Sequence, residues 1–124
     1  MNIKNNLSLV EFERAIMHLR EALAQKKDEY IRDSVIRRFE FTNELAWKSS
    51  KKVMGSNSIA PKVLIREMAA QKLILDTNVW FDYLDGRNLS SHTYKEDLAE
   101  QIYELAKKSV SDFELLLKNL KAIQ

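Results

Sequence analysis

The sequence lacks cysteine altogether and contains only two glycines, one proline and two histidines among its 124 residues. Without cysteine the chain has no disulfide, no thiolate metal site and no cysteine nucleophile. Glycine and proline form most tight turns, so a sheet with many reversals is difficult to build from this chain. Two isolated histidines are too few for a typical zinc cluster, and we expect neither a metal nor a bound cofactor. The composition therefore favours an all-helical fold.

Long apolar runs are also absent, and no stretch approaches the roughly 18 apolar residues of a membrane span. The N-terminal stretch MNIKNNLSLVEFERAI has no apolar core of signal-peptide length. Lys and Arg exceed Asp and Glu by only 20 to 18, so any contact with nucleic acid must be local. We expect one soluble, cytoplasmic domain over residues 1–124, with no membrane partner.

Apolar residues recur at alternating steps of three and four through most of the chain, which is typical of helices that bury one face. Ser8 and Glu11 predict a capping box at the start of a first helix that runs to about residue 25. A second helix is predicted from Asp28 to Met54, with Gly55 as its C-terminal cap.

Two short helices are predicted after this pair. Pro61 sits where proline is tolerated, at the first turn of a helix that covers residues 63–71. Asp76 or Thr77 can cap the next helix, which has the sequence NVWFDYLD.

The end of that short helix and the start of the last helix are also marked in the sequence. Gly86 closes the short helix, and Thr93 with Glu96 forms a second capping box, so the last helix runs from Tyr94 to about Ala122. Its apolar arc is wide enough to contact several neighbouring helices, or one neighbour and a second subunit. The predicted fold is an all-α, antiparallel up-and-down bundle of three long helices and two short ones.

The stretch GRNLSSHTY, which joins the last short helix to the last long one, gathers residues with useful chemistry. Arg87 and His92 are five apart, which on one uninterrupted helix would place them about 140° apart, on different faces. The glycine, serine and threonine residues around them predict an interruption, and a bend would let both side chains converge. His92 would then precede a helix N-terminus, which favours an anion such as phosphate. Arg87 adds a planar cation, and histidine can act as acid or base near neutral pH.

This stretch resembles a known motif. RNLSSH is similar to the Arg-x4-His motif of the HEPN superfamily, small helical bundles of which many are ribonucleases, and RNLSSHTY is similar to the extended form found in HepT-type toxins. Other stretches resemble the branch called nucleotidyltransferase substrate-binding proteins, and the resemblance spans about residues 8 to 120. These stretches are RRFEFTNELAWKSSKKVM, APKVLIREMAAQKLI, WFDYLDGRNLSSHTY and AEQIYELAKKSVSDFELLL.

The resemblance implies a role for each residue of the motif. It implies that Arg87 and His92 are catalytic, with Asn88 as the polar residue that often follows the arginine. It implies that Tyr94 is the tyrosine that a partner antitoxin, a minimal nucleotidyltransferase, modifies with AMP from ATP. The only Gly-Ser pair here, at 55–56, is not followed by the Asp-x-Asp of such an enzyme, so the partner must be a separate polypeptide.

An arginine and a histidine suit RNA cleavage without a metal, because the 2′-OH attack needs a base, an acid and a cation for the phosphorane. One histidine per chain would make a homodimer necessary, with one His92 as base and the other as acid. Two rival interpretations stay open: a non-catalytic substrate-binding subunit of a two-component nucleotidyltransferase, and a structural helical adaptor. For Arg87 the alternative is a contact with a helix C-terminus or with a carboxylate such as Asp82 or Asp85.

Outside this stretch two features bear on RNA binding. Lys48, Lys51 and Lys52 share a helix face at i, i+3 and i+4 spacing, and they could follow RNA phosphates or form a solvated face. Trp47 and Trp80 fit packing in the bundle better than base stacking.

Overall fold

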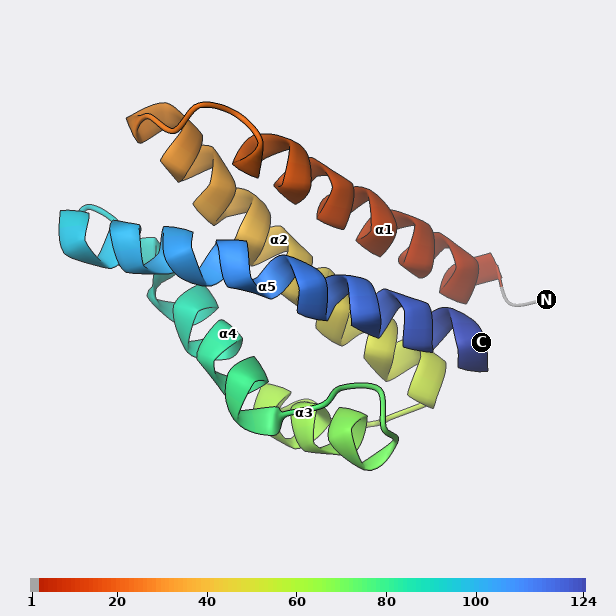
Figure 1. Ribbon diagram of the computed structural model, residues 1–124. Helices are drawn as coiled ribbons and strands as arrows, with labels where there is room; N and C mark the ends of the chain where they lie inside the picture. Colours follow the sequence, from red (N-terminus) through yellow and green to blue (C-terminus); the bar gives the residue numbers. More distant parts are fainter. Residues whose placement is uncertain (1–2) are drawn as a thin grey trace.

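Three long helices lie side by side in the computed structural model, which describes residues 3–124 (Figure 1). Two short helices lie opposite α1: the second packs against α2 and α5, the first packs against α2 and the second, and a 3₁₀ turn follows the second. Residues 3–124 contain no strand. The predicted all-α, antiparallel bundle of three long and two short helices is therefore confirmed. The elements are α1 (Ile3–Leu23), α2 (Glu29–Met54), α3 (Pro61–Ala70), α4 (Thr77–Leu89), η1 (Ser90–His92) and α5 (Glu96–Ile123).

Two of the predicted helix caps, Gly55 and Asp76, are present, and α2 begins beside Asp28, as predicted. The Asp28 carboxylate accepts a hydrogen bond of 2.7 Å from the backbone N–H of Ile31 and so caps α2. Gly55 ends α2 in the left-handed conformation, with φ of 65°, which glycine adopts without steric cost. Asp76 caps α4 by accepting a hydrogen bond of 2.8 Å from the N–H of Asn78.

The capping box predicted at Ser8 and Glu11 is wrong, because α1 begins at Ile3 and both residues lie within it. The polar residues before Ser8 continue the helix instead of ending it. A Ser-x-x-Glu pair also occurs inside helices, where the backbone N–H groups are already bonded one turn back, so the pattern alone does not fix a start.

Gly86 does not close α4, which continues to Leu89. The glycine is buried inside the helix, and a Cβ atom there would lie 2.5 Å from Cδ2 of Leu105 and 3.3 Å from Cε2 of Phe39. Here glycine permits the close approach of α4 to α2 and α5, not a turn. This close approach fixes the position of the next residue, Arg87.

The capping box predicted at Thr93 and Glu96 is also wrong. Helix α5 begins at Glu96, two residues later than predicted, and no side chain caps it. The Glu96 carboxylate instead accepts a hydrogen bond of 2.5 Å from Nη1 of Arg32 on α2. Arg32 is only 5% exposed and also binds Glu100, so a buried cation ties the first turn of α5 to α2. Lys27 and Arg32 together hold the pKa of the Glu100 carboxyl below its usual value.

The core is built around aromatic side chains from four helices. Phe12, Phe39, Trp80, Tyr83 and Phe113 are all buried, and the ring centroids of Trp80 and Phe113 lie 5.6 Å apart in an edge-to-face arrangement. Trp80 therefore packs in the bundle, as predicted. Tyr83 donates its hydroxyl hydrogen bond to Asp112, and burial raises the pKa of its hydroxyl.

The wide apolar arc of α5 is covered within the chain. Helices α1, α2 and α4 all pack against α5, and the buried side chains of α5 face them. Of the two alternatives for this arc, contact with several neighbours is the one observed, so the arc gives no independent argument for a second subunit. Among residues 3–124 no helix combines the length and the apolar character needed to cross a membrane.

Candidate functional site

The stretch that carries the predicted site lies where α4 gives way to α5. Helix α4 ends at Leu89, and the Ser90 hydroxyl donates a hydrogen bond of 2.6 Å to the carbonyl oxygen of Arg87. The chain tightens into η1, and the N–H of Lys95 then bonds the carbonyl oxygen of His92 at 3.1 Å. The predicted interruption of the helix is therefore present, four residues later than the glycine that suggested it.

Arg87 points from the last turn of α4 toward α2, where its Nη2 donates a hydrogen bond to the Glu44 carboxylate. Both side chains are 35% exposed, so the pair is half-buried between the two helices. The Nε atom of Arg87 is buried and has no hydrogen-bond partner within the chain. The Glu44 carboxylate holds the planar guanidinium of Arg87 in one orientation, and part of the side chain stays exposed.

The partner of Arg87 was not among the carboxylates considered from the sequence, which were Asp82 and Asp85. Those residues precede Arg87 on its own helix, and both are exposed. Glu44 is 43 residues away in the chain, and no local sequence pattern predicts that its turn of α2 faces the end of α4. Its position depends on the packing that Gly86 permits.

His92 and Tyr94 are the most accessible members of the motif. The His92 ring is exposed, and its centroid lies 6.0 Å from that of the Tyr94 ring, with the two planes at 75°. Tyr94 is 76% exposed. His92 does not directly precede a long helix, because three residues separate it from Glu96 at the start of α5. His92 therefore does not lie at the N-terminus of α5, where an anion would be favoured.

The structure brings Arg87 together with Glu44 and His92 together with Tyr94. Convergence of Arg87 and His92 on one point stays a prediction. Asn88 follows Arg87 on the last turn of α4 and is exposed, which fits an orienting role at the surface.

The three lysines predicted to share a face do lie on α2. Lys48 and Lys52 are exposed, and Lys51 is half-buried. Lys48 and Lys51 line a cavity of about 150 Å³ beside Trp47, which is half-buried and so packs in part against the bundle. Contact between these lysines and RNA stays a prediction.

Metal ligands do not gather near this stretch. Within the part of the chain that the structure describes, no three histidine or carboxylate side chains come close enough together to hold an ion. The chemistry available between α4 and α5 is that of a guanidinium, an imidazole and a phenol.

Sequence comparison identifies the relatives of the chain. The family described as "Nucleotidyltransferase substrate binding protein like" matches residues 7–122. A Haemophilus influenzae protein described as a probable ribonuclease HepT is 31% identical over 94 residues. That match covers 69% of this chain and 64% of the relative, so the chain spans less than two thirds of that protein's length.

Solved structures share the fold. A Thermus thermophilus protein superposes with a TM-score of 0.82 at 30% identity, covering 89% of this chain and 98% of that one. A second protein, from Haemophilus influenzae, gives a TM-score of 0.82 at 26% identity, covering 91% of this chain and 98% of its own. The latter structure is described as revealing the fold of a substrate-binding domain of a nucleotidyltransferase.

Proposed function

Because this chain belongs to the nucleotidyltransferase substrate binding protein like family, we propose that it is a HepT-type toxin, a metal-independent endoribonuclease that a nucleotidyltransferase neutralises. The observation that carries the proposal is the surface segment at the end of α4. It offers an arginine oriented by Glu44 and, five residues on, an exposed histidine. The similarity to a probable ribonuclease HepT supports the same activity.

The chemistry assigns one proton transfer to each histidine of a homodimer. One His92 accepts the proton of the RNA 2′-OH, and the 2′-oxygen attacks the adjacent phosphorus. Arg87 donates hydrogen bonds to the non-bridging oxygens as charge develops on them. The second His92, from the other protomer, gives a proton to the departing 5′-oxygen. The products are a 2′,3′-cyclic phosphate and a 5′-hydroxyl end, and the two histidines have exchanged protonation states.

This route gives a direct test of the proposed function. We expect the purified chain to cleave RNA in the presence of a chelator and to leave 2′,3′-cyclic phosphate ends. The same sequence with 2′-O-methyl groups should not be cut, because the nucleophile is blocked. Gel analysis of end-labelled RNA, followed by mass spectrometry of the product ends, measures both results. Cleavage of the methylated strand, or loss of cleavage with chelator, would contradict the mechanism.

We infer that Glu44 is a positioning residue for Arg87, since its carboxylate holds the guanidinium in place. Glu44→Ala should lower kcat about 10- to 100-fold, the usual effect of misplacing a catalytic group by about 1 Å. KM should stay level or fall, because removal of a negative charge favours RNA binding. The matched control is Glu114→Ala, which breaks a partly exposed pair with Arg20. Glu44→Asp should recover part of kcat; equal losses in Glu44→Ala and Glu114→Ala would show that the pair has only a structural role.

The proposed control of the enzyme acts at Tyr94. A minimal nucleotidyltransferase, carried on a separate chain, would transfer AMP from ATP to the Tyr94 oxygen and release pyrophosphate. The exposure of this side chain gives such an enzyme access. The AMP ester adds bulk and negative charge beside His92, where the substrate phosphate would bind, so it excludes RNA by occupancy and repulsion.

A second candidate function is that of a non-catalytic subunit that binds a substrate for the nucleotidyltransferase. It is favoured by the solved Haemophilus influenzae structure that is described as a substrate-binding domain. The two functions differ in one measurement. A non-catalytic subunit would leave RNA intact and would accelerate nucleotidyl transfer by its partner onto a third molecule.

A further inference from the structure

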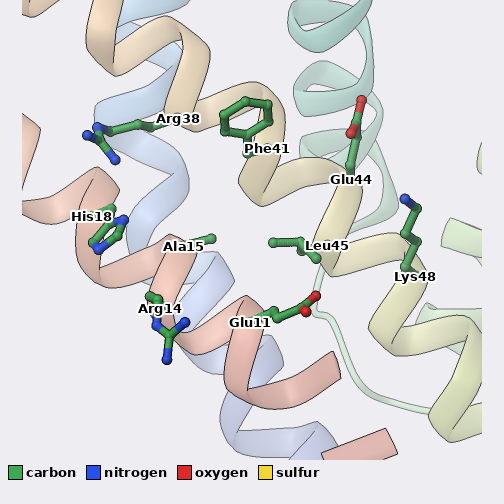
Figure 2. Close-up of a pocket in the computed structure, with 9 residues that line it drawn as sticks. All are labelled: Glu11, Arg14, Ala15, His18, Arg38, Phe41, Glu44, Leu45 and Lys48. Atoms are coloured by element: carbon green, nitrogen blue, oxygen red, sulfur yellow. The ribbon is translucent and has the colours of Figure 1, made fainter. Parts of the chain in front are cut away.

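An open cavity of about 350 Å³ lies between α1 and α2, away from the motif itself (Figure 2). Arg14 and Ala15 line it from α1, and Arg38, Phe41 and Leu45 line it from α2. Its volume is at the lower end of the range for sites that hold small molecules. Of the three lysines predicted to share a face of α2, Lys48 lines this cavity.

The cavity carries cations that no carboxylate neutralises. Three of the cations that line the cavity make no ion pair within residues 9–124, namely Arg14, Arg38 and Lys48. The Nε atom of Arg38 donates a hydrogen bond of 3.3 Å to the Ser34 hydroxyl. Arg20, which lies on the same helix as Arg14, is by contrast paired with Glu114. Two carboxylates also border the cavity: Glu11, and Glu44, which is already bound to Arg87. The surplus of positive charge favours an anion.

His18 also lines the cavity, and the rest of the lining is apolar. Ala15 and Leu45 face each other across the cavity, and Phe41 leaves 45% of its surface exposed beside them (Figure 2). The Arg37 guanidinium lies over one face of the Phe41 ring, with its Cζ 4.9 Å from the ring centroid. The exposed remainder of the ring, next to unpaired arginines, is the combination that binds single-stranded nucleic acid, with bases stacked on the ring and phosphates on the cations. A purely inorganic anion would leave the apolar part unused.

Glu44 connects the cavity to the proposed active site. It borders the cavity on α2, and Figure 2 shows its side chain directed away from Leu45, toward the helix whose Arg87 it holds. A strand with one nucleotide in the cavity would therefore pass Glu44 on its way to Arg87. We propose that the α1–α2 cavity is a subsite for one nucleotide of a single-stranded RNA, next to the nucleotides at the cleaved bond. This subsite rests on the proposed ribonuclease function.

The test measures binding without cleavage. The probe is a short fluorescein-labelled oligouridylate, 2′-O-methylated throughout, and its affinity is read by fluorescence anisotropy at several salt concentrations. For the double variant Arg14→Gln and Arg38→Gln we expect affinity to fall about tenfold or more. The negative slope of log K against log salt should become less steep, by about 0.7 for each lost phosphate contact. Phe41→Ala should weaken binding about fivefold or more, with an unchanged slope.

The control variant is Arg20→Gln, which removes an arginine from another face of α1 and should change affinity less than about twofold. Lys48→Gln provides a further variant at an exposed position if the double variant folds poorly. Equal affinity and slope for the double variant and Arg20→Gln would overturn the proposal. So would displacement of the probe by AMP at the same concentration as by unlabelled oligonucleotide, because the cavity would then take free nucleotides. If RNA is not cut, yet the cavity variants lose affinity as expected, the ribonuclease function fails and the cavity remains a site that binds single-stranded RNA.

Discussion

His92→Ala should reduce RNA cleavage by about 10²- to 10⁴-fold while the helical bundle stays folded. In a homodimer the substitution removes the base and the acid at once, so neither proton transfer retains its group. The imidazole is exposed and belongs to a 3₁₀ turn outside the core, so its loss creates no cavity and leaves no buried polar group unpaired. The variant should therefore lose RNA cleavage without losing thermal stability.

The measurement is the initial rate on end-labelled RNA, together with growth of cells that express each variant and the thermal unfolding of each protein. Ser91→Ala is the matched control, because Ser91 is exposed in the same turn and has no role in the proton transfers. A His92→Ala protein that cuts RNA within about tenfold of the wild-type rate would remove the assignment. If wild type and variant are both inactive on RNA, yet both accelerate the partner's nucleotidyl transfer, the substrate-binding function takes its place.

Periodicity was enough to predict the helices, because burial of one face repeats along the chain. Helix ends were predicted correctly where a single local interaction decides them, as at Asp28 and Gly55. They were wrong where a distant residue competes. Arg32, a buried cation far along the chain, takes the Glu96 carboxylate that a capping box would have used.

The same limit applies to the site. The motif residues stand together in the sequence, so a local pattern suffices to propose Arg87 and His92. The side chain that orients Arg87 comes from α2, and it reaches Arg87 only because Gly86 lets α4 approach so closely. The cavity between α1 and α2 is assembled from residues whose spacing on each helix is ordinary. Only tertiary packing shows that their cations lie together and unpaired.

Tyr94→Phe should make the chain completely resistant to the proposed nucleotidyltransferase while its cleavage of RNA, measured alone, stays at the wild-type rate. The phenylalanine ring keeps the edge contact with His92 and removes only the hydroxyl that would receive AMP. Co-expression with the nucleotidyltransferase should therefore restore growth for the wild type and leave growth inhibited for the variant.

The readout combines colony counts with the intact mass of the chain after co-purification, where the wild type should gain one adenylyl group on the Tyr94 peptide. Tyr30→Phe is the matched control, because Tyr30 on α2 is 83% exposed and Tyr94 is 76% exposed, so accessibility alone would not separate them. This control should still be modified and neutralised, since the proposed effect requires AMP beside His92. Full neutralisation of Tyr94→Phe without a mass increase would refute this mode of control and would point to inhibition by binding of the partner alone. An adenylyl group found on another residue with growth restored would also refute it, and would point to modification at that residue.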